Sequence, residues 1–222
     1  MKILILLLCF ILTSCSEKKP EVRITEKKDS VKKQVSNKDT ASIEIKTISK
    51  SLKTATGKNF KIDERKKSSS VSDYLISGIG FGTFSDTLKI ENKDPLKNIF
   101  NADLDKDGFE EVYIITQATG SGSYENIIGV ASDKDKSYRL INIQEIRDKD
   151  LQNTGQFSGY MGRDSIYVSD GVLTREFPVY LKTDAMSDPS GGKRLILYAL
   201  KSSGNAYEMI VVNSIYMKKA VK

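Results

Sequence analysis

The sequence contains no histidine and only two cysteines among its 222 residues. Histidine is the usual general base of Ser-His-Asp triads and, with cysteine, the usual ligand of structural zinc, so both kinds of site are excluded. Cys9 lies inside an N-terminal apolar run and Cys15 lies just after it, so neither is expected to remain a free thiol in the mature protein. An enzyme built from this chain would have to work with carboxylates, lysine or a bound cation.

Long apolar runs are also scarce. The run Ile3–Leu12 has ten residues, about half the ~20 that a membrane-spanning helix needs. It follows Lys2 and ends in the sequence Leu-Thr-Ser-Cys, which resembles the cleavage box of bacterial lipoproteins. We therefore expect residues 1–14 to be a signal peptide and Cys15 to carry the lipid. Ser16 after the cysteine resembles an outer-membrane address, so we expect an exported lipoprotein anchored in the outer membrane that faces the periplasm or the cell surface.

Residues 15–65 have little aromatic content, with Phe60 alone, and are rich in lysine, serine and threonine. Residues 16–70 hold 16 Lys and Arg against 8 Asp and Glu, whereas residues 71–222 hold 18 against 21. This composition predicts a basic, flexible and disordered tether over residues 15–65. Because the chain is expected to be exported, we interpret the tether as a solvated spacer and expect no nucleic-acid partner. Residues 41–52 alternate weakly, which leaves a short strand or helix open.

Residues 66–222 show the pattern of an all-β domain. Short segments rich in Val, Ile, Tyr and Phe are separated by Gly, Asn, Asp, Ser and Pro, which favours a single antiparallel β-sandwich or flattened barrel of about eight strands. Asp170-Gly171 is typical of a tight hairpin turn, and residues 142–151 alone have some helical character. The segments expected to be strands are 74–77, 86–91, 111–117, 126–132, 138–143, 165–169, 173–180, 194–200 and 207–216.

An acidic loop precedes the strand expected at 111–117. Asp103, Asp105 and Asp107 alternate, Gly108 follows, and Glu111 comes three residues later, a spacing that suits Ca²⁺. The twelfth position is Ile114 where an EF-hand loop has glutamate, and a strand follows in place of a helix. The loop is therefore a candidate calcium site, although we expect no required cofactor. The alternative is an acidic turn whose aspartates accept hydrogen bonds from nearby amides.

A second loop, Ala118–Glu125, follows the same strand. Gly120 and Gly122 permit close approach of the backbone to another surface, and Ser121, Ser123 and Tyr124 provide three hydroxyl groups with little bulk. A loop of this composition suits insertion into a cleft. The alternative is an ordinary glycine-rich hairpin connection.

The order of these motifs resembles the family of periplasmic inhibitors of invertebrate-type (i-type) lysozyme. The segments that carry the resemblance are DLDKDGFEEVYIIT, ATGSGSY, GYMGRD, REFPVY and PSGGKR, which cover roughly residues 100–200. In that family the Ser-Gly-x-Tyr loop enters the active-site cleft of the lysozyme. The resemblance implies a binding loop formed by Ser121, Gly122, Ser123 and Tyr124, an i-type lysozyme as the protein partner, and no catalytic activity.

Two other functions are considered. The first is an envelope-anchored Ca²⁺-binding or adhesive β-domain, in which the acidic loop is the functional site. The second is a hydrolase that uses Asp103, Asp105, Asp107 and Glu111 as acid and base, which is disfavoured because these residues lie in one local loop instead of flanking a cleft. The sequence leaves the oligomeric state open between a monomer and a homodimer.

Overall fold

The computed structural model describes residues 46–82, 86–204 and 206–219. All of them belong to one compact unit. The predicted signal peptide, the predicted lipidation site Cys15 and residues 15–45 of the predicted tether lie outside the described residues. Within the described part of the chain, no helix has both the length and the apolar character needed to cross a membrane.

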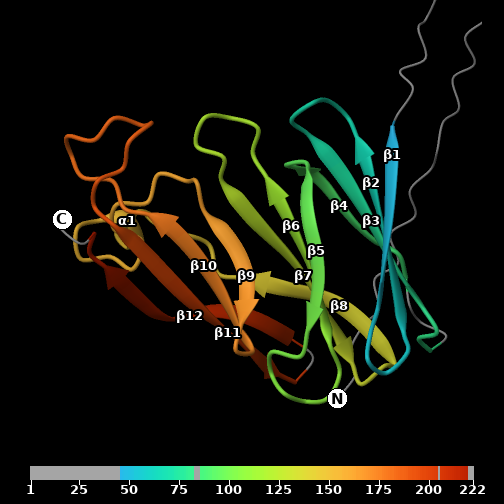
Figure 1. Cartoon of the computed structure of the whole chain (residues 1–222). Helices are drawn as coiled ribbons and strands as arrows, with labels where there is room; N and C mark the ends of the chain where they lie inside the picture. The colour runs from blue at the N-terminus through green and yellow to red at the C-terminus, as the bar shows by residue number, and fades with distance from the viewer. Residues whose placement is uncertain (1–45, 83–85, 205, 220–222) are drawn as a thin grey trace, which may run out of the picture. The chain divides into compact units, whose positions relative to one another are not determined.

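These residues form twelve strands and one short helix (Figure 1). The prediction of an all-β fold is confirmed, with 55% of the described residues in strands and 2% in helix. The elements in chain order are β1 (Thr47–Lys53), β2 (Asn59–Lys66), β3 (Ser72–Ile79), β4 (Leu88–Lys93), β5 (Leu96–Ala102), β6 (Glu111–Gln117), β7 (Glu125–Asp133), β8 (Ser137–Ile143), α1 (Asp148–Leu151), β9 (Ser165–Ser169), β10 (Val172–Pro178), β11 (Lys193–Ser203) and β12 (Ala206–Met217).

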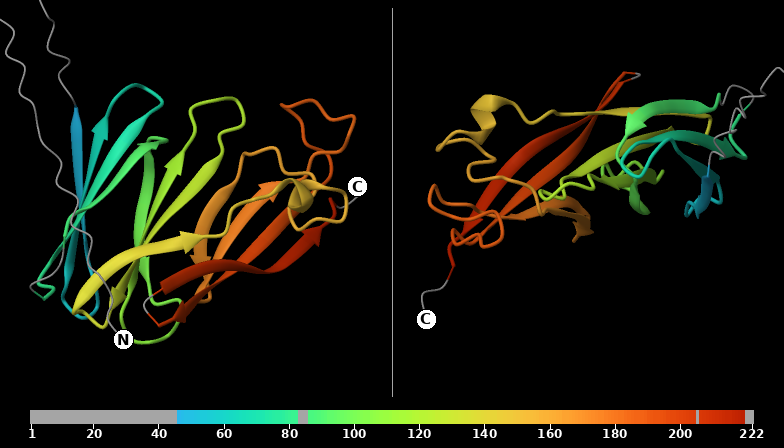
Figure 2. Two further views of the ribbon diagram at one scale, coloured as in Figure 1. Left: turned by 180° about the vertical axis from the view of Figure 1, so that it is seen from behind. Right: turned by 90° about the horizontal axis from the view of Figure 1, so that it is seen from above.

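The strands belong to two sheets (Figure 2). A four-stranded sheet has the order β1-β2-β3-β4, and an eight-stranded sheet has the order β5-β6-β7-β8-β12-β11-β10-β9. The larger sheet is nearly closed and barrel-like. Its neighbouring strands are antiparallel except at one seam, where β12 runs parallel to β8 and pairs Glu208 with Asn142 and Met209 with Ile143. The four-stranded sheet and the parallel seam were not predicted.

Two apolar cores share strands β6 and β7. One core lies within the eight-stranded sheet and includes Tyr113, Ile115 and Ile127, and the other joins the two sheets through Val112 and Ile114. Both faces of β6 are therefore buried, which explains why EVYIITQ reads as a nearly continuous apolar run. The four-stranded sheet supplies its half of the second core from Phe60, Ile62, Tyr74 and Ile76, all of which are 0% exposed.

The tether prediction is wrong for residues 47–65, because strands β1 and β2 form there. They pair as an antiparallel hairpin from Thr47↔Arg65 to Lys53↔Asn59. The buried Phe60 and Ile62 anchor this hairpin to the rest of the domain. The correction also changes the charge of the folded part, since residues 46–222 hold 26 Lys and Arg against 23 Asp and Glu. The folded part is therefore not acidic.

Most of the local predictions agree with the strands, with two differences. Asp170 and Gly171 have φ values of 52° and 72°, as the predicted tight turn between β9 and β10 requires. The expected helical segment contains only the four residues of α1, and β5 was not predicted.

Candidate functional site

The serine-rich loop, defined as Ala118–Tyr124, joins β6 to β7. The Ala118 amide donates to the Tyr124 carbonyl at 2.8 Å, and the Ser123 amide donates to the Gly120 carbonyl at 2.9 Å. Ser123 has a φ of 45°, in the left-handed region that non-glycine residues seldom occupy. Ser121 is exposed, and Tyr124 is 40% exposed. The loop is thus closed by its own hydrogen bonds and presents the side chains of both residues to solvent.

A second loop, the support loop Gly159–Asp164, holds the serine-rich loop from one side. The Arg163 amide donates to the Gly122 carbonyl at 2.6 Å, and the Glu125 amide donates to Asp164 Oδ1 at 2.9 Å. Gly162 has a φ of 90°, and a Cβ added there would lie 2.1 Å from the Gly122 carbonyl oxygen. Both the backbone conformation and the close approach therefore require glycine at position 162.

Aromatic packing fixes the ring of Tyr124. It meets the ring of Tyr160 edge-on, with 5.6 Å between centroids and 72° between planes. The ring also lies against Gly122 and Gly162, where an added Cβ would lie 2.2 Å and 3.1 Å from it. One edge of the ring is thus held by the protein while a substantial part of the side chain stays exposed, an arrangement that suits an interface anchor.

Behind the two loops lies a buried ion pair. Arg175 contacts Asp164 at 3.1 Å, and their side chains are 6% and 0% exposed. The Tyr160 hydroxyl donates to Asp164 Oδ2 at 2.9 Å and accepts a hydrogen bond from Arg175 at 3.1 Å. Burial raises the pKa of Tyr160 well above its usual value. The hydroxyl therefore keeps the proton that it donates to Asp164.

A second buried acid closes the base of the serine-rich loop. Glu125 is 1% exposed, accepts a hydrogen bond from the Ile166 amide at 2.8 Å, and pairs with Lys97. Lys97 belongs to β5 and Ile166 belongs to β9, so Glu125 connects the two edge strands of the eight-stranded sheet. Glu125 is buried although Lys97 is exposed, so removal of Lys97 would leave a buried negative charge without its partner.

The acidic loop lies at the other end of β6. Carboxylate oxygens of Asp103, Asp105, Asp107 and Glu111 all lie within 4.8 Å of one another. Asp103 also accepts backbone hydrogen bonds from Asp107 at 3.1 Å and from Gly108 at 3.0 Å, and Gly108 has a φ of 90°. Both features considered for this loop are therefore present: its carboxylates lie close together, and one of them accepts hydrogen bonds from nearby amides.

The electrostatics of this cluster fit a hard cation. The pKa of Glu111 is raised to about 8, chiefly by burial and also by the negative charges of Asp105 and Asp103. Burial and the neighbouring Asp107 also raise the pKa of Asp105. Ca²⁺ prefers carboxylate oxygens and would offset this mutual repulsion. Asp103, Asp105, Asp107 and Glu111 are the residues that would hold it.

The structure does not bring the two predicted sites together, because they flank opposite ends of β6 (Figure 1). Sequence reasoning did not identify Glu125, Asp164 and Arg175 as the supports of the serine-rich loop. The last two lie in the segments GYMGRD and REFPVY, but a single sequence carries no signal that they form an ion pair.

Comparison with known proteins gave no matching family model, no matching curated protein and no matching solved structure.

Proposed function

We propose that this protein inhibits lysozyme of the invertebrate type by inserting the serine-rich loop into the active-site cleft of the enzyme. The observation that carries the proposal is the loop itself, which exposes Ser121 and Tyr124 on a backbone held by the support loop. In this proposal the protein is an outer-membrane lipoprotein anchored through Cys15, and it protects the cell wall without catalysing a reaction.

The chemistry of the target supports this assignment. A lysozyme cleaves its substrate with two carboxyl groups that flank the scissile bond. Hydroxyl groups from Ser121 and Tyr124 can donate hydrogen bonds to such carboxylates, and the small residues between them let the backbone enter a narrow cleft. Because the loop is already ordered by hydrogen bonds, little conformational entropy is lost when it binds. Electrostatic attraction between the two proteins does not support the proposal, because the folded part of this protein has no net negative charge.

The first test is a panel of lysozymes. The soluble chain, starting at Ser16, is mixed with purified i-type, chicken-type and goose-type enzymes, and residual lysis of cell walls is measured against inhibitor concentration. We expect saturable inhibition that is selective for the i-type enzyme. Unchanged lysis by all three enzymes would contradict the proposal.

Substitutions in the loop test the mechanism. Ser121→Ala and Tyr124→Phe should each raise the inhibition constant about 10-fold or more, since each removes a hydrogen bond to a charged group worth about 1.5–3 kcal/mol. Tyr167→Phe is the matched control, because Tyr167 is 37% exposed and lies outside the loop. Equal inhibition constants for all three variants and the wild type would show that the loop is not the inhibitory element.

A second candidate function is binding of Ca²⁺ by the acidic loop of an envelope-anchored or adhesive β-domain. The convergence of four carboxylates and the raised pKa of Glu111 favour it. Addition of CaCl₂ should raise the melting temperature of the wild type and leave that of Asp103→Asn/Asp105→Asn unchanged. A calcium-dependent shift in a protein that inhibits no lysozyme would favour this second function over the first.

A further inference from the structure

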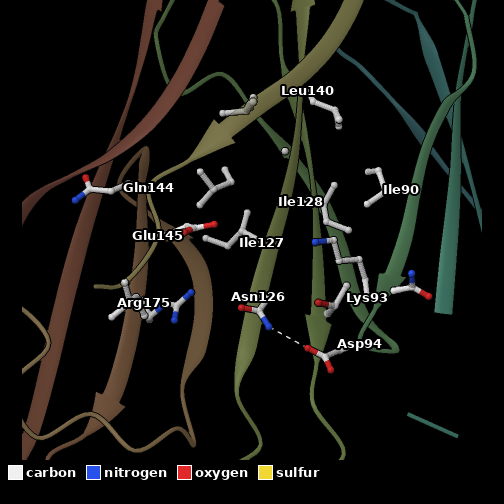
Figure 3. A pocket seen from close by; sticks show the side chains of 16 residues that line it. Ile90, Lys93, Asp94, Asn126, Ile127, Ile128, Leu140, Gln144, Glu145 and Arg175 are labelled. Carbon is white, nitrogen blue, oxygen red and sulfur yellow. Dashed lines mark hydrogen bonds between the residues drawn. The ribbon is translucent and has the colours of Figure 1, made fainter. Parts of the chain in front are cut away.

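Strands β7 and β8 separate partway along their length. Their antiparallel pairing runs from Asp133↔Ser137 to Gly129↔Ile141 and stops there. Beyond this point β8 leaves β7 and continues along β12, to which Gln144 donates a backbone hydrogen bond at the Met209 carbonyl. Figure 3 shows the end of β8 running away from β7, with Ile127 and Glu145 on the two sides of the opening.

Backbone groups on both walls of this gap are directed into it. The Glu125 amide points away from β6, because it donates to Asp164, so the amide and carbonyl of Ile127 point to the same side. The Gln144 amide points toward β12, so the backbone of Ile143, one residue earlier, points toward β7. Ile127 and Ile143 would form the next pair of the ladder, and the separation of the strands leaves both without that partner.

The gap opens into a cavity of about 690 Å³, a volume in the range of binding sites for ligands. Two residues of its lining, Arg175 and Thr116, are 5% and 1% exposed. The polar atoms Arg175 Nε and Thr116 Oγ1 have no hydrogen-bond partner among the described residues, but both are closed off from the cavity. The case for a ligand therefore rests on the backbone groups that face the gap. The apolar part of the lining comes from Ile90, Ile127, Ile128, Leu140, Ile141, Ile143 and Ile146.

The charges of the lining narrow the class of ligand. Lys93 and Arg175 are matched in number by Asp94 and Glu145, and Arg175 already pairs with Asp164, so the cavity has no strong field of one sign. A neutral ligand that brings its own backbone donors and acceptors fits these walls. An extended peptide supplies such groups to both walls and places alternate side chains against isoleucines.

We propose that the gap between β7 and β8 binds an extended, apolar peptide segment of another protein, which adds a short strand beside β7. The peptide pairs with the backbone of Ile127 and Ile143. This site is separate from the exposed face of the serine-rich loop and does not depend on lysozyme inhibition.

Selection of peptides tests the proposal directly. A phage-displayed library of random decapeptides is selected on the soluble chain, and the most enriched sequence is synthesised with blocked termini. A second form carries N-methyl groups on alternate residues, which removes the donors that strand pairing uses. We expect alternating apolar sequences, saturable binding by calorimetry, and binding at least 10-fold weaker for the methylated form. The largest amide shifts in NMR spectra should fall at Ile127 and Ile143.

Two substitutions of exposed apolar residues form a matched pair, one inside the cavity as the test and one outside it as the control. Leu140 lines the cavity and is 44% exposed, whereas Val212 on β12 is 51% exposed and lies outside it. Leu140→Asp should weaken binding at least 10-fold and Val212→Asp should not change it. The proposal is overturned if no sequence is enriched, if N-methylation has no effect, or if the amide shifts lie elsewhere. Binding of dodecanoate in the cavity without binding of any selected peptide would also overturn it.

Discussion

The pKa of Glu111 is raised because its carboxylate is buried beside two aspartates. Its pKa in the folded protein is raised to about 8 from an ordinary 4.5, so the folded state holds a proton that the unfolded state has lost between these values. This contribution to stability is complete below pH 4.5 and disappears as the pH rises through 8. At neutral pH the unfolded chain has already lost this proton, so Glu111 opposes folding unless a cation neutralises the cluster.

We predict that Glu111→Gln flattens the pH dependence of the unfolding free energy between pH 4.5 and 8. The wild-type slope should approach about −1.4 kcal/mol per pH unit from this group alone. Glutamine still accepts the hydrogen bonds that Glu111 receives from the Leu104 amide and the Tyr113 hydroxyl. Urea unfolding at several pH values without calcium measures the effect, and identical slopes in the two proteins would contradict the assignment.

The unpartnered hydroxyl of Thr116 gives a second prediction for a single residue. Thr116→Val removes a buried polar atom at constant shape and should raise the unfolding free energy by about 1 kcal/mol. Thr174→Val is the control, because the buried Thr174 hydroxyl donates to the Val172 carbonyl at 3.4 Å and its loss should destabilise by about 1 kcal/mol. Denaturant titration should give opposite signs for the two variants.

Among the elements, the contact between the two loops depends on one glycine. Gly162→Ala places a methyl group against the Gly122 carbonyl at a positive φ, so it should displace the serine-rich loop and weaken inhibition by about 10-fold or more. Gly120→Ala should leave the inhibition constant within about 2-fold, because nothing lies within 4 Å of an added Cβ there. Lysis assays and amide exchange of residues 118–125 measure both variants. Equal behaviour of the two would show that the support loop does not position the site.

Strand prediction succeeded where burial follows the sequence pattern. The run EVYIITQ of β6 is buried on both faces, and its bounds follow from its residues alone. In β2 the buried face is Phe60, Ile62 and Glu64, and the third position of the alternation is a charged residue at 1% exposure. Glu64 is satisfied by the Ser72 hydroxyl at 2.7 Å and the Leu96 amide at 3.0 Å, contacts that exist only after folding. The alternation was therefore hidden, and β2 was assigned to the tether.

The candidate site was also predicted only in part. Small hydroxyl residues and glycines between two strong strands indicated an exposed loop, and alternating aspartates indicated a cation site. The supports of the loop could not be predicted, because Asp164 and Arg175 lie far from Ser121 in sequence. Their ion pair forms only when β10 and the support loop meet inside the eight-stranded sheet.

At the scale of the molecule, the two apolar cores share β6 and β7, so neither sheet is expected to unfold alone. We predict a single cooperative transition in which Ile62→Ala and Ile196→Ala lower the same midpoint. Each residue is 0% exposed, in a different core, and each change should cost about 2–5 kcal/mol. Calorimetry together with amide exchange in both sheets measures this. A separate early transition in strands β1–β4 would show that the four-stranded sheet folds independently.

The parallel seam between β8 and β12 has a consequence for the order of folding. Strands β5 to β8 can form from neighbouring segments, but β12 follows every other strand of the described chain and is the element that joins the two halves of the sheet. Contacts between segments so distant in sequence slow the search for the native state. The sheet can therefore be completed only after nearly the whole chain has been synthesised, and until then the edge of β8 is open to pairing with other chains.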